Sequence, residues 1–306
     1  MFADESEEPM KETDGLLVLD KPKGLTSRGA LDRALRWFPS RTRMGHTGTL
    51  DPLATGLLVL CLGSATRLAE YVQQMSKTYR TVVRLGAVSD TDDADGTVTP
   101  VEGASEPHAT TMAACVAGFV GVQEQVPPAF SAAKVMGRRA YDLARAGREV
   151  RLAARRVTID AIDVVRYAYP DLELEVRCGK GTYVRSLARD LGERLGCGAY
   201  VQALRRTRVG PFRVEDALSL ETDAATARSK VRPAKEAVAE LPAVTLPDAE
   251  LRRLTRGQEL PWPGAPSGEG DDPQMAIFAE DGTLALVARL DRARRRLKPE
   301  KVLRGS

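Results

Sequence analysis

The residues best suited to chemistry lie in one glycine-punctuated loop, MGHTGTLDPLATG, at positions 44–56. It contains one histidine, His46, and one carboxylate, Asp51, which directly precedes a proline. An Asp-Pro pair commonly opens a turn, so Asp51 is either a turn residue or a catalytic carboxylate. The loop lacks the G-K-[ST] of a P-loop and the G-x-G-x-x-G of a dinucleotide site, so nucleotide phosphate does not explain it.

Tyr79 and Arg185 are two further residues whose positions allow a structural or a chemical role. Tyr79 follows the polar sequence SKT at the end of a predicted strand, where a half-buried tyrosine usually belongs to the core. Arg185 lies one turn into a predicted helix and flanks its apolar face. An arginine there either extends to solvent or pairs with a buried acid.

The acidic stretch SDTDDADGTVTPVE, at 89–102, has some features of a calcium loop. If Gly96 is the sixth position of an EF-hand, Thr91 takes the place of the first aspartate ligand. A strand also precedes the stretch where an EF-hand requires a helix. We therefore interpret it as an acidic turn that includes at most one functional carboxylate.

No metal site is expected from the cysteines and histidines. The four cysteines form no CxxC pair, and the chain has only two histidines, His46 and His108. A zinc site would be hard to assemble from this set. We expect structural, buried thiols at Cys61, Cys115, Cys178 and Cys197.

Hydrophobic periodicity predicts the elements that position these residues. LLVLDKPKGLTSRGALDRALRWF predicts a buried strand, a turn, and a helix capped by Thr26 or Ser27. LLVLCLG predicts a second buried strand, followed by a helix capped by Ser64. TYRTVVRLG and LELEVRC alternate as strands, and GKGTYVRSLARDLGERLGCG predicts a helix that ends near Gly196. Strands and helices interleave without a βαβ repeat, which favours an α+β fold with a mixed or antiparallel sheet.

The composition is that of a soluble intracellular protein. Hydrophobic residues make up 43% of the 306 residues and charged residues 28%, with a net charge of +3. The uncharged run 53–66 is too short to span a bilayer, and no secretory signal precedes the first strand. We therefore expect a cytoplasmic protein without a membrane segment.

Three stretches differ from this balanced background. Residues 1–14 carry six acids and one lysine and predict a disordered tail. Residues 134–156 carry eight Lys/Arg and two acids, which is typical of an inserted basic arm or of a solvated helix face. From about residue 243, the hairpin QMAIFAEDGTLALVARLD and a basic terminus predict a small β module.

Several long motifs follow one another between Gly15 and Phe212. They are GLLVLDKPKGLTS, RMGHTGTLDPLATGLL, KTYR, DTDDADG, VPPAFSAAKVMGRRAYDLAR, and CGKGTYVRSLARDLG with LRRTRVGPF. Together, and in this order, they resemble the TruB-type family of tRNA pseudouridine synthases. The resemblance implies a catalytic domain at 15–242 with a basic RNA-binding insertion at about 127–156. It also implies a PUA-like RNA-binding module at 243–306, whereas 215–242 matches nothing recognisable.

The resemblance implies a reaction that needs no cofactor and no metal. The family breaks the N1–C1′ bond of uridine, rotates the uracil and rejoins it through C5. Asp51 matches the family's catalytic aspartate, which meets the electron-poor C1′ with negative charge. Whether Asp51 adds to C1′, adds to C6 of the base, or removes a ribose proton stays open.

Other roles follow from the same resemblance. Arg185 matches the arginine that pairs with the catalytic aspartate, and an opposite charge at that distance keeps an acid ionised. Tyr79 matches the tyrosine that stacks on the target base, with its hydroxyl a candidate to remove the C5 proton. Tyr183 and Leu204 match residues that line the pocket.

Access to the target uridine implies further RNA contacts. A uridine inside a folded loop must be flipped out, at a cost of a few kcal/mol. Gly45 and Gly48 allow close approach of the loop to RNA, and His46 matches the histidine that fills vacated stacking space. The resemblance also implies phosphate contacts for Lys21, Arg43 and Lys134, and a carboxylate near the active site, Asp93.

The implied substrate is uridine 55 in the T stem-loop of tRNA. The expected protein is a monomer with no obligatory protein partner. Two alternatives remain: the archaeal and eukaryotic relative that is guided by a small RNA within a multi-protein particle, and an RNA chaperone that binds tRNA without chemistry. The acidic tail, the insertion and the short C-terminal module favour the stand-alone bacterial type.

Overall fold

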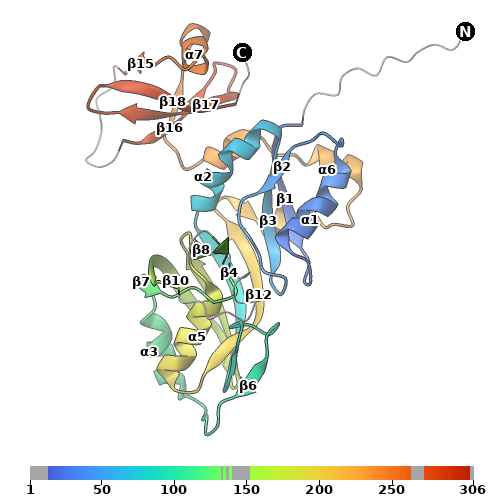
Figure 1. Ribbon diagram of the computed structural model, residues 1–306, viewed down its shortest axis with the longest axis vertical. Coiled ribbons are helices and arrows are strands. Elements are labelled where there is room, and N and C mark those ends of the chain that lie inside the picture. Colours follow the sequence, from blue (N-terminus) through green and yellow to red (C-terminus); the bar gives the residue numbers. More distant parts are fainter. Residues whose placement is uncertain (1–12, 132–133, 136–137, 140–151, 263–271, 304–306) are drawn as a thin grey trace, which may run out of the picture.

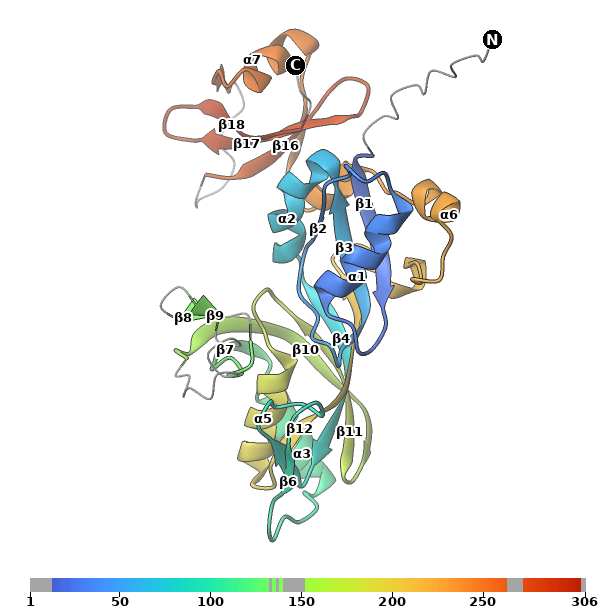
Figure 2. The ribbon, with the colours of Figure 1, turned by 45° about the vertical axis from the view of Figure 1, so that its right-hand side comes forward.

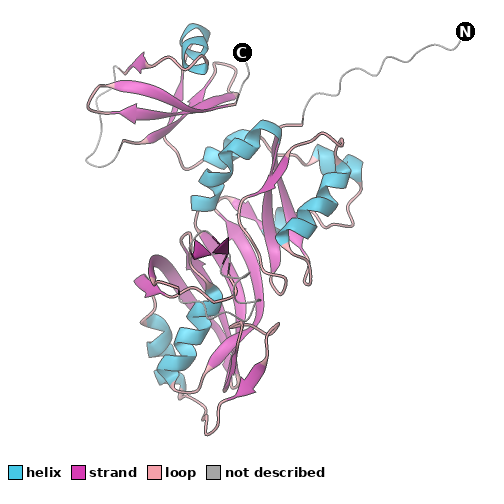
Figure 3. Cartoon of the chain, in the orientation of Figure 1, coloured by secondary structure: helices cyan, strands magenta, loops and turns pink. Residues whose placement is uncertain are grey.

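The computed structural model describes residues 13–131, 134–135, 138–139, 152–262 and 272–303. Nearly all of the predicted acidic tail and most of the predicted basic arm lie outside these residues. Figures 1 and 2 show a large twisted sheet flanked by helices, with a smaller sheet at one end of the molecule. Strands and helices interleave along the main body (Figure 3), and the predicted α+β class is confirmed.

The main sheet has nine strands. They are β1 (Gly15–Lys21), β2 (Met44–His46), β3 (Thr55–Leu62), β4 (Lys77–Leu85), β7 (Gly121–Gln125), β10 (Arg155–Ala168), β11 (Asp171–Cys178), β12 (Ala199–Val209) and β13 (Phe212–Arg213). Their order is β1-β3-β12-β4-β11-β10-β7, with β2 paired to β3 and β13 paired to β12. The β3–β12 pair is parallel and the other pairs are antiparallel, so the sheet is mixed as predicted.

Two burial patterns in this sheet explain its sequence. β1 and β3 are buried on both faces, which accounts for their continuous runs of leucine and valine. β4 and β11 bury only one face, and their inward side chains belong to one core cluster with the helices. The alternation expected for these two strands is confirmed by the burial of Val83, Leu85, Leu172, Leu174, Val176 and Cys178.

Helices cover the sheet from several segments of the chain. The α-helices are α1 (Ser27–Ala34), α2 (Ala69–Gln74), α3 (Ala109–Ala117), α5 (Val184–Leu195) and α6 (Ala224–Ser229). The 3-10 helices are η1 (Leu35–Trp37), η2 (Gly63–Leu68), η3 (Val214–Asp216) and η4 (Ala234–Val238). Short two-stranded pairs are β5 (Ala87–Ser89) with β6 (Val98–Pro100), and β8 (Lys134–Val135) with β9 (Arg138–Arg139).

The helix ends agree with the sequence signals in two cases and differ in one. Thr26 caps α1 by accepting a hydrogen bond from the Gly29 N–H at 2.9 Å, as predicted. Gly196 ends α5 in the left-handed conformation, which suits glycine. The predicted Ser64 cap is wrong: the segment opens as the 3-10 helix η2 after Leu62, without a side-chain cap.

The smaller sheet lies after residue 242. Its strands are β14 (Ala243–Thr245), β15 (Leu260–Pro261), β16 (Gln274–Phe278), β17 (Leu284–Asp291) and β18 (Arg296–Val302), in the order β14-β16-β17-β18-β15. The helix α7 (Asp248–Thr255) contributes Leu251 and Leu254 to a core shared with β16 and β17. The predicted hairpin is therefore present, as the pair β16–β17.

Candidate active site

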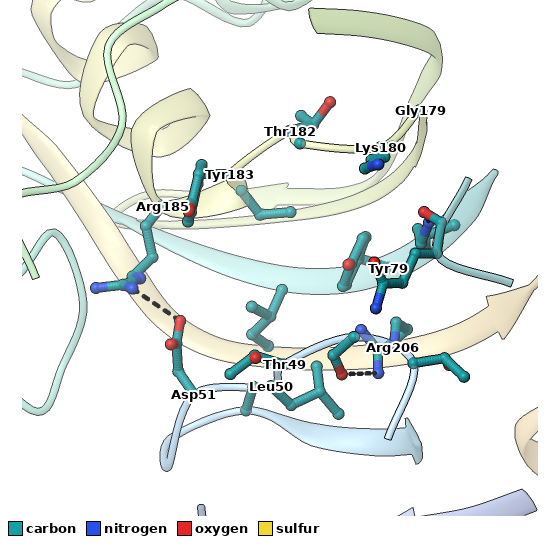
Figure 4. A pocket seen from close by; sticks show the side chains of 18 of the residues that line it. Thr49, Leu50, Asp51, Tyr79, Gly179, Lys180, Thr182, Tyr183, Arg185 and Arg206 are labelled. Atoms are coloured by element: carbon teal, nitrogen blue, oxygen red, sulfur yellow. Dashed lines mark hydrogen bonds and ion pairs between the residues drawn. The ribbon is translucent and has the colours of Figure 1, made fainter. Parts of the chain in front are cut away.

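A cavity of about 520 Å³ lies where the 44–56 loop meets the main sheet. Its walls are the loop itself, β4, the end of β12, and the segment 179–185 that leads into α5 (Figure 4). Asp51, Tyr79, Tyr183, Arg185, Leu204 and His46, all predicted from the sequence, line this one cavity.

Asp51 and Arg185 form an ion pair in the wall of the cavity. The Asp51 Oδ2 lies 2.9 Å from Arg185 Nη2 (Figure 4). The Arg185 side chain is only 5% exposed, whereas the Asp51 side chain is 36% exposed. The arginine is therefore fixed by the fold, and the carboxylate stays accessible from the cavity.

Several groups hold the Arg185 guanidinium in place. It donates to the backbone carbonyls of Thr91 at 3.0 Å and Phe130 at 2.9 Å, and Asp93 Oδ2 lies 3.4 Å from Nη1. Asp93 is itself buried, and its Oδ1 accepts hydrogen bonds from the Thr91 hydroxyl and the Asp95 N–H. The acidic turn thus supplies a fixed carboxylate for Arg185.

The segment before α5 is also clamped. The Gln125 side chain on β7 accepts from the Tyr183 N–H at 2.8 Å and donates to the Tyr183 carbonyl at 3.1 Å. The guanidinium of Arg155 stacks over the Tyr183 ring, 4.8 Å from its centroid. These contacts fix the direction from which Arg185 enters the cavity.

The electrostatics of Asp51 reflect two opposed effects. Burial raises the pKa of its carboxyl above the usual value, and the negative charge of Asp93 acts in the same direction. The charge and hydrogen bond of Arg185 lower that pKa and favour the ionised form. Removal of Arg185 would therefore leave the carboxyl with a still higher pKa.

Tyr79 lies on the opposite wall, beside Arg206. The two residues are register partners on β4 and β12, and both line the cavity (Figure 4). Burial raises the pKa of the Tyr79 hydroxyl, and the charge of Arg206 opposes this. Arg206 also donates to the carbonyls of Leu57 at 2.7 Å and Gly48 at 3.2 Å, which connects β12 to the loop that carries Asp51.

The other predicted site residues have different surroundings. Burial, with the nearby Arg206 and Arg28 charges, lowers the pKa of His46 and favours the neutral ring. Lys21 is fully buried, and its Nζ donates to the carbonyls of Pro22 and Leu25. This burial differs from the expected phosphate contact, because no ammonium surface faces solvent.

Arg43 and Lys134 are the two remaining residues that the sequence predicted as phosphate contacts. Arg43 is exposed just before β2, as a phosphate contact would require. The backbone of Lys134 lies in β8, whereas its side chain is outside the described part of the structure. The basic-arm residues 140–151 are outside it as well.

Sequence reasoning missed Arg206, Gln125 and Lys180 as site residues. Arg206 is 3% exposed in the cavity floor, yet LRRTR reads as an ordinary basic stretch. Leu204 and Arg206 share one face of β12, but this follows only once the segment is known to be a strand. Gln125 and Lys180 had no spacing signal, since only the fold brings β7 and 179–185 together.

The fold and this cavity are those of an enzyme in which a mixed sheet presents an arginine-paired aspartate to a pocket of about 520 Å³. The TruB family pseudouridylate synthase N-terminal domain matches residues 36–184. The tRNA pseudouridylate synthase B C-terminal domain matches residues 185–247. The chain belongs to the TruB family of pseudouridylate synthases.

Relatives at substantial identity carry the same family name. The tRNA pseudouridine synthase B of Syntrophobacter fumaroxidans is 46% identical over 286 residues, which cover 90% of this chain and 93% of the relative. That of Chromohalobacter salexigens is 45% identical over 250 residues, covering 80% and 81%. That of Xanthomonas euvesicatoria is 40% identical over 297 residues, covering 95% and 94%.

Solved structures share the fold at lower identity. A crystal structure of a Cbf5-Nop10-Gar1 complex aligns with a TM-score of 0.75 at 24% identity, covering 95% of this chain and 85% of that one. A structure of an H/ACA RNP bound to a substrate RNA containing 2'-deoxyuridine aligns with a TM-score of 0.72 at 23% identity, covering 100% and 94%. Both likenesses show the pseudouridine synthase fold.

Proposed function

We propose that this protein isomerises uridine to pseudouridine in tRNA, at position 55 in the T arm. The observation that carries the proposal is the Asp51–Arg185 pair, with its buried arginine and accessible carboxylate, in a chain of the TruB family. The reaction breaks the N1–C1′ bond, rotates the uracil and joins C5 to C1′. It changes connectivity and not composition, so it requires no co-substrate.

Asp51 supplies negative charge where the glycosidic bond breaks. Its carboxylate meets the electron-poor C1′ region of a flipped uridine, as a nucleophile or as a base. Arg185 keeps it ionised against the effect of burial, which otherwise favours the neutral acid. Asp93 and the two carbonyls hold Arg185, so the pair is preorganised before RNA binds.

Tyr79 stacks on the uracil and handles the C5 proton. Because its pKa is raised, the hydroxyl is neutral near pH 7. It therefore accepts the C5 proton only as it passes its own proton to another acceptor. The aromatic face and the hydroxyl thus have separable roles.

RNA binding extends beyond the pocket. Residues 15–242 act as the catalytic domain, the insertion at about 127–156 closes over the T stem-loop, and 243–306 form a PUA-like RNA-binding module. The protein acts as a monomer in the cytoplasm without an obligatory protein partner. None of the helices in the described residues is long and apolar enough to cross a membrane.

Tritium release tests this function. Unmodified tRNA transcript labelled at C5 of uridine is incubated with purified protein, and release of tritium to water is measured. We expect release of one equivalent from wild-type tRNA and none from a transcript with cytidine at position 55. Release that persists without uridine 55 would overturn the assigned position, and no release from either RNA would overturn the function.

A further inference from the structure

The main sheet has a second groove, on the face opposite the catalytic cavity. It encloses about 640 Å³ and is lined by strands β4, β10, β11, β12 and β13. Successive side chains of a strand point to opposite faces, so Thr78 lines this groove while Tyr79 lines the catalytic cavity. Five arginines line the groove: Arg80, Arg177, Arg205, Arg208 and Arg213.

Three of these arginines form one row across the sheet. Arg177 is the register partner of Thr78, and Thr78 is the partner of Arg208. Arg208 is in turn the partner of Arg213 on β13. Adjacent strands lie about 4.8 Å apart, so the row spans about 14 Å over four strands.

The row differs from three other arginines on this face, each of which pairs with an acid. Arg84 lies 2.8 Å from Asp171, and Arg205 lies 2.7 Å from Asp20. Arg80 lies 3.6 Å from Glu175. Each of these cations is neutralised within the fold.

No ion pair neutralises the row within the described residues. Arg208 uses its Nε to donate to the Gly210 carbonyl at 2.7 Å, which leaves its charge uncompensated. Asp163 and Glu215 line the groove, yet neither forms an ion pair with a described residue. Like charges directly opposite each other destabilise a sheet, so the Arg208–Arg213 pair suits a ligand that supplies negative charge.

The row adjoins residues that line the catalytic cavity. Thr78 follows Lys77, and Arg177 precedes the segment 179–182; both Lys77 and that segment line the cavity. Lys180 in that segment is exposed. An RNA chain that leaves the cavity over Lys180 therefore reaches the row by crossing one end of the sheet.

We propose that Arg177, Arg208 and Arg213 bind the phosphate backbone of tRNA outside the T stem-loop. The inference rests on the proposed function, because it takes tRNA as the occupant. An open groove with three cations spread along it fits an extended polyanion better than a single small anion. Guanidinium groups also match phosphate oxygens with two parallel hydrogen bonds.

The test is a salt titration of binding with two RNAs, full-length tRNA transcript and the isolated T stem-loop. In the triple variant Arg177→Gln, Arg208→Gln, Arg213→Gln, the slope of log affinity against log salt should flatten by about 2–3 for tRNA. It should stay unchanged for the stem-loop. The charge-matched control carries Arg33→Gln, Arg36→Gln and Arg41→Gln, three exposed arginines elsewhere, and should keep the wild-type slope for both RNAs.

An unchanged slope for tRNA would overturn the proposal, and so would an equal loss on the isolated stem-loop. The single variant Arg213→Gln, on the short strand β13, provides a second test in case the triple variant misfolds. It should flatten the tRNA slope by about 0.7–0.9. Single-turnover tritium release from the stem-loop should match wild type in every variant. Absence of release from the wild-type protein would instead count against the proposed function, whatever the binding slopes.

Discussion

At the scale of single residues, the site depends on a difference in exposure between two charged partners. Arg185 is buried and held by Asp93, Thr91 and Phe130, whereas Asp51 remains open to the cavity. A buried guanidinium with fixed partners stabilises a carboxylate charge without reorganisation when substrate binds. The pair therefore opposes the rise in the pKa of Asp51 that burial causes, and it favours the ionised carboxylate.

Arg185→Met should lower the single-turnover rate by at least about 10²-fold, because Asp51 loses its stabilising charge. Without that charge the pKa of Asp51 rises further, and only the ionised carboxylate is active. The acid limb of the rate–pH profile should therefore move to higher pH. Arg185→Lys should recover part of the rate and leave the limb near its wild-type position, since lysine keeps the charge and loses the planar fork. Wild-type rates in the methionine variant would show that the pair has no catalytic role.

Tyr79→Phe separates stacking from proton transfer. The ring remains, so tRNA affinity should stay within a few-fold of wild type. Loss of the hydroxyl should slow release of the C5 tritium by about 10²–10⁴-fold, the usual contribution of a positioned acid or base. Equal release rates in the two proteins would make Tyr79 a packing residue on β4.

The sequence predicted the residues whose motifs are long and missed those that depend on strand pairing. Asp51, Tyr79 and Arg185 were placed by GHTGTLDP, KTYR and GTYVR, and all three line one cavity. Arg206 was missed because its partner Tyr79 lies on another strand, 127 positions earlier in the chain. Lys21 was expected at phosphate, but the turn that follows β1 folds its ammonium onto two carbonyls.

At the scale of elements, α5 is the part that brings the site together. It packs against β12 and carries Arg185 in its first turn. Its apolar stripe and Gly196 end were readable from the sequence because both signals are local. The long strand β12 could not be predicted from the sequence. Its exposed face carries arginines, and a bulge interrupts its alternation near Thr207.

Gly192→Ala tests how closely α5 must approach β12. An added Cβ would lie 2.2 Å from the Ala199 nitrogen and 2.4 Å from the Gly198 carbonyl carbon, so the helix must shift. We expect a loss of about 1–3 kcal/mol in the free energy of unfolding and a slower reaction, because Arg185 moves with the helix. The control is Gly29→Ala in α1, where the nearest atom is the Thr26 hydroxyl oxygen at 3.3 Å. Equal unfolding midpoints for the two variants would contradict this packing account.

At the scale of the whole molecule, chemistry and RNA affinity are assigned to different parts. The cavity belongs to the main sheet, and no described residue of the smaller sheet lines it. The hairpin in the C-terminal sheet was predicted from the EDG turn, and the arm was predicted from charge alone. The nine-strand order could not be predicted, because it pairs strands far apart in the chain.

The basic arm should supply affinity for the T stem-loop itself. Replacing Lys134, Arg138 and Arg139 with glutamine should weaken binding and flatten its salt dependence by about two to three units. Unlike the arginine row on the open face, this loss should appear on the isolated stem-loop. The rate of the chemical step at saturating RNA should change little. An unchanged salt slope would show that the arm is a solvated surface and does not bind RNA.

The central claim is that Asp51 performs the isomerisation and that binding does not depend on it. The direct measurement compares wild type and Asp51→Asn for tritium release from C5-labelled tRNA in single turnover, with tRNA affinity measured in parallel. Asparagine keeps the shape of the side chain and removes its charge. The account predicts no detectable release by Asp51→Asn with affinity within a few-fold of wild type. Release near the wild-type rate would contradict the account, because another residue would then carry the chemistry.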